Sequence, residues 1–385
     1  MKRFKFIFIA FVCLTAIIVF IFPADQKSLS NIYQKGKIRL IAELTLDDNS
    51  MPEDVYFEAP VDLTFDTENN IFVCDYKSHN IKVFDISGKF IKTMGRKGQG
   101  PGEFQMPYYL AFAKDRLVVW ELRNRRLSVL MSDGEFVKSI QTPSAEGWPR
   151  KIRSLPNGDF VIERVKSFFG DNEKPQECNI EIFSPNLEYK KTIYNQEFWE
   201  NRYITSPSLT NVPQPFAAKV YWDVSPDGKI IVGYSEKYTI EIFDSEKGRL
   251  SSFNHTYDPI KVTKNDREKL FAGMTTTTPN GIKLGAPDHI VKNTKFPKYK
   301  PAFQYILVDG EGNILIFGHQ KKSFEDIRYF DAFDPKGNFI SNVQVVGDVF
   351  FPSHLSGVYI RGRFFWFRKT DEDGLFKIFK YRIAE

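Results

Sequence analysis

The chain has 385 residues, a length that one large all-β domain can reach. Its 42% of hydrophobic residues is ordinary for a globular protein, whereas 37 Phe and 17 Tyr favour β-strands. The net charge is +5, and three of these charges are Lys2, Arg3 and Lys5 at the extreme N-terminus. The rest of the chain is therefore close to neutral, which argues against a nucleic-acid partner.

The N-terminus reads "MKRFKFIFIAFVCLTAIIVFIFPADQ", with an unbroken apolar run over residues 6–22. As a helix this run would span about 25 Å, enough to cross the hydrocarbon core of a bilayer. The preceding cations should remain cytoplasmic, which places the body in the periplasm or at the cell surface. Cleavage after Ala24 would put the bulky Phe22 at the −3 position. We therefore expect residues 1–24 to anchor the protein in the inner membrane, with a cleaved signal peptide and secretion as the alternative.

A linker over residues 25–36 precedes a body, residues 37–385, that repeats itself. Each repeat contains apolar runs of period two separated by Asp, Asn and Gly turns, a pattern typical of four short strands. The repeats cover about 59–95, 106–140, 148–193, 219–253, 300–345 and 350–385.

The last repeat has only three predicted strands, and "KIRLIAELTL", residues 37–46, belongs to no repeat. We predict that a segment over residues 37–48 supplies the missing strand, because this pairing would close the ring and leave no open sheet edge. The sequence thus predicts an all-β fold, a six-bladed β-propeller with four-stranded antiparallel blades.

Two connections are longer than the others, residues 194–220 and residues 254–300. The second contains "NDREKLFAGM", in which Asn265 and Glu268 have the spacing of a capping box before a short helix. Such insertions either cover a face of the domain or contact a ligand or partner.

The stretch "FDTENNIFVCDYKSHNIKVFDISGKFIKTMGRKGQGPGEFQMP" resembles an NHL-type repeat. The whole chain resembles exported six-bladed β-propeller proteins of bacteria that carry such repeats. The likeness is strong over about residues 59–140, and weaker over 221–253 and 300–343. It implies the architecture and says little about activity, because propellers serve in binding, scaffolding and several enzymatic chemistries.

The glycine-rich part of this stretch, residues 95–107, could in principle cradle a phosphate. Pro101 stands where a P-loop requires Lys, and Glu103 occupies the third glycine position of a dinucleotide fingerprint. We interpret the stretch as the connection between two blades, with glycines at tight turns and Phe104 packed between the blades.

Metal and cofactor motifs are absent from the sequence. The cysteines, Cys13, Cys74 and Cys178, form no CxxC pair, and the five histidines include no HExxH motif. Some lyases with similar repeats use several channel histidines around a metal, but only His354 begins an innermost strand here. We expect no metal and no other cofactor.

The starts of the innermost strands should meet at the mouth of the central channel. The candidate ligand-binding residues at these starts are Asp62, Tyr108, Arg150, Tyr221, Gln304 and His354. The carboxylates of Asp66, Asp227 and Asp309 precede turn residues and are interpreted as hairpin caps. Packing between blades, more than contact with a ligand, is the role expected of Tyr108, Tyr109, Trp148 and Tyr221.

The mixed channel mouth and the missing catalytic constellation favour a binding scaffold over an enzyme. The expected partner is an unidentified protein, peptide or carbohydrate, and the membrane is contacted through the N-terminal helix. The alternative is a lyase or lactone-type hydrolase with a metal in the central channel.

Overall fold

A computed structural model of the chain describes residues 27–143, 146–167, 174–204, 210–274, 276–277, 283–319, 329–347 and 357–385. The predicted membrane segment, Cys13 and His354 lie outside these ranges. Within them, no helix is both long enough and apolar enough to span a bilayer.

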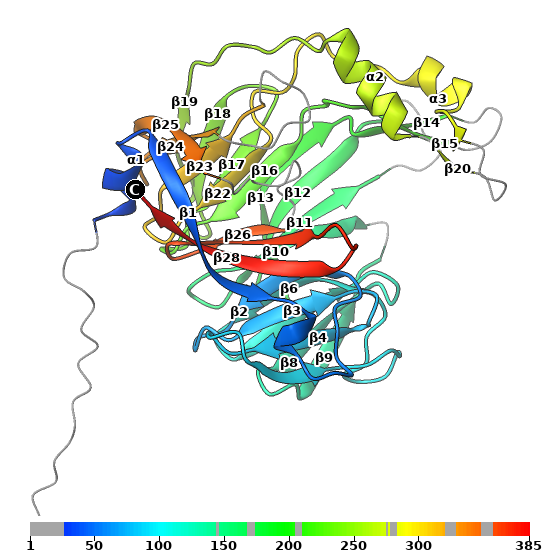
Figure 1. Cartoon of the computed structure of the whole chain (residues 1–385), viewed down its shortest axis with the longest axis vertical. Helices are drawn as coiled ribbons and strands as arrows, with labels where there is room; N and C mark the ends of the chain where they lie inside the picture. The colour runs from blue at the N-terminus through cyan, green and yellow to red at the C-terminus, as the bar shows by residue number, and fades with distance from the viewer. Residues whose placement is uncertain are drawn as a thin grey trace, which may run out of the picture.

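The body is an all-β propeller built from antiparallel sheets (Figure 1). Four sheets have four strands each, hydrogen-bonded in chain order. The first two are β2 (Pro60–Phe65), β3 (Ile71–Asp75), β4 (Asn80–Phe84) and β5 (Phe90–Met94), then β6 (Pro107–Ala113), β7 (Arg116–Glu121), β8 (Arg126–Met131) and β9 (Phe136–Gln141). The next two are β10 (Trp148–Ser154), β11 (Phe160–Lys166), β12 (Gln176–Phe183) and β13 (Tyr189–Phe198), then β16 (Val220–Val224), β17 (Ile230–Tyr234), β18 (Thr239–Asp244) and β19 (Gly248–Asn254).

An eight-stranded sheet has β1 (Lys37–Leu46) in its middle. On one side lie β22 (Tyr305–Val308), β23 (Ile314–Phe317), β24 (Tyr329–Phe333) and β25 (Phe339–Val346), and on the other β26 (Val358–Arg361), β27 (Phe364–Thr370) and β28 (Phe376–Ala384). The pairing predicted between residues 37–46 and the last repeat is present: β1 runs antiparallel to β28 over seven residue pairs. A parallel contact of three pairs between β1 and β25 was not predicted. In Figure 1 the blue β1 runs beside the red β28.

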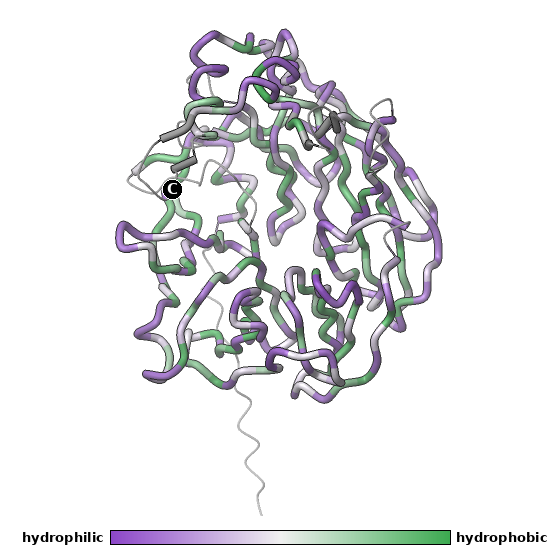
Figure 2. The backbone as a smooth tube through the Cα atoms, turned by 90° about the vertical axis from the view of Figure 1, so that its right-hand side faces the viewer, coloured by the Kyte–Doolittle hydropathy of each residue, from purple (hydrophilic) through white to green (hydrophobic). Residues whose placement is uncertain are grey.

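Inner strands such as β3 and β23 are buried along their whole length, whereas the outer strands β5 and β9 alternate between half-buried and exposed residues over most of their length. Hydrophobic and hydrophilic residues are accordingly interspersed along the backbone (Figure 2). Hairpin turns connect most neighbouring strands, and in several of these turns a side chain accepts hydrogen bonds from backbone N–H groups. The Asp66 and Asp309 carboxylates each accept backbone N–H bonds from residues two and four positions on, as predicted. The prediction for Asp227 was wrong, because Ser225 holds the equivalent position and its Oγ accepts the N–H of Lys229.

The hydrophobic core lies between neighbouring sheets rather than within one. One cluster joins β3 and β4 to β6 and β7, and similar clusters join each later sheet to its successor. The sheet half with β22–β25 packs against β26–β28 and β1. A last cluster joins β1, β27 and β28 to the first sheet. The sheets therefore pack in a closed cycle, in which β1 contributes to the two final contacts.

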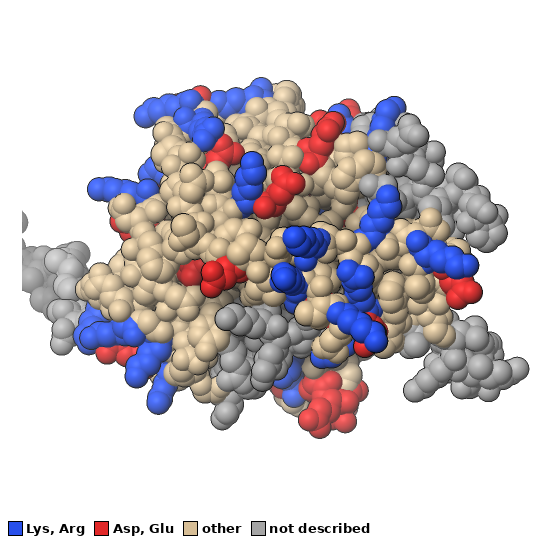
Figure 3. Space-filling view, turned by 90° about the horizontal axis from the view of Figure 1, so that it is seen from above, with Lys and Arg blue, Asp and Glu red and all other residues tan. Residues whose placement is uncertain are grey.

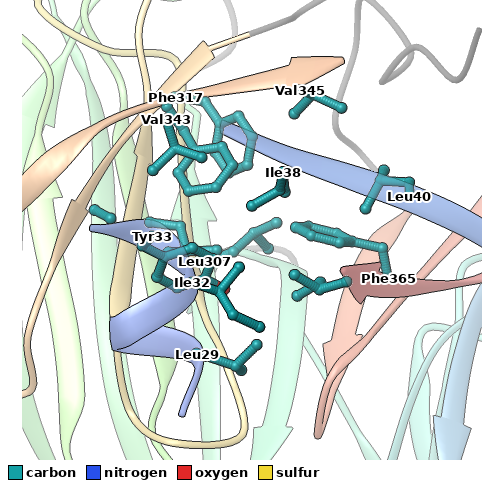
Figure 4. Close-up of a cluster of buried hydrophobic side chains, with 14 of the residues drawn as sticks. Leu29, Ile32, Tyr33, Ile38, Leu40, Leu307, Phe317, Val343, Val345 and Phe365 are labelled. Atoms are coloured by element: carbon teal, nitrogen blue, oxygen red, sulfur yellow. The ribbon is translucent and has the colours of Figure 1, made fainter. Parts of the chain in front are cut away.

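The N-terminal segment is part of this closure. Helix α1 (Leu29–Tyr33) buries Leu29, Ile32 and Tyr33 against β25 and β1 (Figure 4). The Tyr33 hydroxyl donates to the Asp309 carboxylate at 3.0 Å, and the Ser341 hydroxyl donates to the carbonyl oxygen of Tyr33 at 2.5 Å. α1 thus fastens the start of the body to the sheet that β1 completes.

The glycine-rich stretch is a connection between sheets, as the sequence predicts. Phe104 is fully buried beside β3 and β6, and a Cβ atom on Gly95 would lie 2.3 Å from its ring. The Arg126 guanidinium donates to the carbonyl oxygens of Gln99, Gly100 and Glu103, so the loop presents acceptors to a cation rather than donors to a phosphate.

A 3-10 helix (Asp48–Ser50) lies between β1 and β2. The two long connections carry the remaining elements: β14 (Asn201–Ile204), β15 (Thr210–Pro213), α2 (Lys264–Gly273), β20 (Thr276–Thr277), β21 (Lys283–Leu284) and α3 (Asp288–Asn293). The predicted capping box of α2 was shifted by two residues. Thr263 caps the helix and Asp266 completes the box, because its carboxylate reaches back to the Thr263 N–H at 2.8 Å. Seen from above, the molecule carries both signs of charge intermixed (Figure 3).

Candidate ligand-binding channel

A cavity of about 350 Å³ lies where the first strands of the sheets converge. Its walls come from β2, β6, β10, β16, β22 and β26, together with side chains from β11, β12, β13 and β27 and from neighbouring loops. The charged and aromatic lining residues are Asp62, Tyr108, Tyr109, Arg150, Lys151, Arg153, Glu163, Phe198, Glu200, Lys219, Tyr221, Trp222, Tyr305, Tyr359 and Arg368.

β-Bulges widen the set of side chains that reach this cavity. The register shifts after the first residue of β2 and of β6 and after the second residue of β10, which inserts Val61, Tyr108 and Arg150. Each of these residues lines the cavity together with its successor in the chain. In a regular strand, consecutive side chains point to opposite faces, so one of each pair would point away from the cavity. The bulge allows both side chains of the pair to line it.

Glu200 forms the first charged group of the cavity. Its carboxylate pairs with Arg150 and with Lys219, each at 2.5 Å. Burial alone would raise the pKa of Glu200, but the two cations outweigh burial and hold that pKa below its usual range. The carboxylate is thus ionised and is shared by two cations.

Asp223, on β16, does not itself line this cavity but pairs with two of the cations that do. Its Oδ1 lies 3.6 Å from Lys151 Nζ and 3.5 Å from Arg153 Nε, while Oδ2 accepts the N–H of Val308 at 3.1 Å. Lys151 also donates to the carbonyl oxygen of Trp222. Burial lowers the pKa of Lys151 to about 8, in spite of Asp223.

The two other carboxyl groups have neutral donors as their hydrogen-bond partners. Asp62 accepts the N–H of Leu110 at 2.7 Å, and Glu163 accepts the indole N–H of Trp222 at 2.8 Å. Burial raises the pKa of Asp62 to about 7 and raises the pKa of Glu163 above its usual value. Both groups therefore carry less negative charge than exposed carboxylates would.

Tyrosines supply most of the remaining lining. Tyr108, Tyr109, Tyr221, Tyr305 and Tyr359 are half-buried, and their hydroxyls form no hydrogen bond with any described residue. The rings of Tyr108 and Tyr221 pack between sheets as predicted, Tyr108 on Tyr76 at 5.9 Å and Tyr221 on Tyr305 at 5.8 Å between centroids. The rings serve packing between sheets, and the hydroxyls remain available in the cavity.

A second cavity, of about 580 Å³, lies at the hairpin-turn ends of the same strands. Only Arg153 and Tyr359 line both cavities, and the Arg153 guanidinium lies 5.0 Å from the centre of the Tyr359 ring. This stacked pair forms the boundary between the two cavities.

The structure brings four of the six predicted channel residues together: Asp62, Tyr108, Arg150 and Tyr221 line one cavity. Gln304 does not line it, because its side-chain amide turns away and donates to the carbonyl oxygen of Gly318 at 3.1 Å. His354 lies outside the described residues.

The sequence reasoning missed Lys151, Arg153, Glu163, Tyr305 and Tyr359, since it considered only strand starts. A signal existed: "PRKIRS" places three cations within four residues of an innermost strand.

Among the residues that the structure describes, no histidine lines this cavity, and the cysteine that lines it, Cys178, is buried. His79 is a turn residue with φ 58°, and its Nδ1 accepts the N–H of Met106 at 2.9 Å. Cys74 and Cys178 are both free. Among the described residues, no three His, Cys, Asp or Glu side chains are grouped closely enough to hold a metal ion.

The sheet arrangement and the central cavity define a β-propeller protein. The model of a family described as a 6-bladed beta-propeller, DUF5128, matches residues 52–111. A search of the curated proteins finds no match to this chain.

Among solved structures, the chain is similar to a member of the DUF4221 family from Bacteroides vulgatus, with a TM-score of 0.53 and 12% identity over 90% of this chain and 99% of that one. It is also similar to virginiamycin B lyase from Staphylococcus aureus, with a TM-score of 0.39 and 12% identity over 84% of this chain and 94% of that one. A calcium-binding protein, regucalcin, from Agrobacterium tumefaciens has a TM-score of 0.40 and 11% identity over 90% of this chain and 96% of that one. At such identities the likeness to the first structure shows the fold alone.

Proposed function

We propose that this protein is a six-bladed β-propeller outside the cytoplasm that binds a polar small ligand in its central channel, as a scaffold rather than an enzyme. The observation that carries the proposal is the cavity into which six first strands converge, with tyrosine hydroxyls that have no partner among the described residues. Polar groups that converge in a cavity of this size are the usual mark of a ligand site.

The number of six blades is supported by the cyclic order of the buried clusters. The eight-stranded sheet then counts as two blades, because β25 and β1 share only three aligned pairs. β1 would be the outer strand of the last blade, and the description of the matching family agrees with this count.

A binding role is favoured because the channel carboxylates are already engaged. Glu200 and Asp223 are held by cations, whereas Asp62 and Glu163 accept hydrogen bonds from neutral groups. A lyase or lactone-type hydrolase with a channel metal is the second candidate. Metal analysis of the purified protein separates the two: stoichiometric zinc or calcium that is lost on changing Asp62 would favour the enzyme.

Hydrogen–deuterium exchange tests the binding site directly. The full-length protein in detergent is screened against sugars, amino acids and short peptides by thermal shift, and each stabilising compound is mapped by exchange. We expect protection in β6, β10, β16 and β22, whose backbones carry the cavity residues. Protection confined to the outer strands, or no protection by any stabilising compound, would refute a channel site.

A further inference from the structure

Among the residues that the structure describes, the lining of this cavity carries five cations against the three carboxyl groups of Asp62, Glu163 and Glu200. Arg150 and Lys219 share Glu200, and Lys151 and Arg153 share Asp223. A fifth cation, Arg368, donates to the carbonyl oxygen of Pro60. Clustered cations in a half-buried site are costly unless an anion balances them, so the cavity is prepared for a negatively charged group.

Lys151 and Arg153 are the cations best placed for this group. Their side chains are 15% and 22% exposed, against 36% and 39% for Arg150 and Lys219. They therefore lie deeper in the cavity, where water screens less and a charge-assisted hydrogen bond is stronger. Arg153 also stacks on Tyr359, which fixes the orientation of its guanidinium.

The rest of the lining is aromatic and hydroxylated rather than aliphatic. Tyr109, Tyr221 and Tyr305 come from separate strands and combine a ring with a free hydroxyl. Such a surface fits a ligand body with both apolar faces and hydroxyl groups. The volume of about 350 Å³ is at the small end for ligand pockets, which points to one or two ring-sized units rather than a protein segment.

We propose that the channel ligand is an acidic sugar, with its carboxylate between Lys151 and Arg153 and its hydroxyls toward the tyrosines. This proposal rests on the proposed function, since it names the ligand class of the same cavity. A neutral sugar would leave the cation surplus unbalanced, and a small inorganic anion would leave the tyrosine hydroxyls without partners.

Calorimetric titration of the full-length protein in detergent tests the ligand class. The probes are glucuronic acid, galacturonic acid and their disaccharides, with glucose, glutamate and phosphate as comparisons. We expect at least one acidic sugar to bind about tenfold or more tightly than glucose, because a carboxylate adds charge-assisted hydrogen bonds. Glutamate and phosphate should bind more weakly than that sugar.

Two variants locate the contacts. Arg153→Gln should weaken binding of the acidic sugar about tenfold or more, with binding of glucose unchanged. Tyr305→Phe removes a hydroxyl that has no partner among the described residues, so folding should be preserved while sugar binding weakens a few-fold. Lys229→Gln, which alters an exposed turn lysine beside Asp227, is the matched control and should bind like the wild type.

The outcomes separate this inference from the proposed function. Equal binding of glucose, equal or tighter binding of glutamate or phosphate, no binding of any acidic sugar at millimolar concentration, or wild-type affinity in both variants would each overturn the acidic-sugar proposal. If exchange mapping then places another compound in the channel, the binding scaffold stands. If no compound protects the channel strands, the proposed function fails as well.

Discussion

Individual polar residues around the channel join one sheet to the next. Asp62 on β2 accepts the N–H of Leu110 on β6, and Asp223 on β16 accepts the N–H of Val308 on β22. In both cases a carboxyl group on the first strand of one sheet bonds the first strand of another sheet. Their surroundings differ, because Asp223 has two cations within 4 Å whereas burial raises the pKa of Asp62 to about 7.

This difference makes the stability contribution of Asp62 depend on pH. An unfolded Asp has a pKa near 4, and burial raises that of Asp62 to about 7. Between these values the folded protein binds a proton that the unfolded chain does not, so this contribution falls as the pH rises. The Asp62→Asn variant should therefore have a higher free energy of unfolding than the wild type near pH 8. This difference in the free energy of unfolding should be about 1–3 kcal/mol smaller near pH 5.

Urea denaturation at several pH values checks the prediction for Asp62. Asp85→Asn is the control, because Asp85 is an exposed turn carboxylate whose pKa is lowered by its hydrogen bond to Ser87. It should show no such closing gap above pH 5. A gap between Asp62→Asn and the wild type that stays constant with pH would contradict the raised pKa.

At the level of elements, β1 joins distant parts of the chain. Ile38 is fully buried in the cluster with α1 and β25, whereas Ile41 on the same strand is 42% exposed (Figure 4). Removing buried methyl groups costs transfer free energy and leaves a cavity. Ile38→Ala should lower the free energy of unfolding by about 2–5 kcal/mol, and Ile41→Ala by less than about 0.5 kcal/mol.

Chemical denaturation of both variants measures this contrast. Deletion of residues 37–46 should be more severe than either, since β28 would lose one of its two antiparallel partners and two hydrophobic clusters would lose the residues of β1. Equal stability losses for Ile38→Ala and Ile41→Ala, or an unchanged melting temperature after the deletion, would show that β1 does not close the propeller.

At the level of the whole molecule, the apolar run over residues 6–22 leads to the proposal of an anchored, extracytoplasmic body. We expect the full-length protein in the membrane fraction, released by detergent but not by high salt. The same protein should be cut by protease added to spheroplasts, and a variant without residues 1–24 should remain in the cytoplasm. Protection from protease in intact spheroplasts would refute export, and recovery in the soluble fraction would refute the anchor.

The sequence by itself determined the all-β propeller class and the pairing of β1 with β28. The propeller class follows from local signals, namely apolar runs of period two, turn residues and one unassigned strand. The pairing of β1 with β28 is a long-range contact, and it was predicted because an unpaired sheet edge is unfavourable. The sequence also predicted that the glycine-rich stretch connects two sheets. Its glycine spacing does not match the known phosphate-binding motifs, and Phe104 is buried.

Only the tertiary structure decided which side chains meet in the channel. The β-bulges in β2, β6 and β10 cannot be predicted from residue spacing. The bulge in β10 brings both Arg150 and Lys151 to the cavity. The sharing of Asp223 by Lys151 and Arg153, and the turn of the Gln304 side chain away from the cavity, depend on contacts between residues 14 to 72 positions apart in the chain. The pKa values and ion pairs of the channel residues depend on their neighbours in space, and no sequence motif specifies those neighbours.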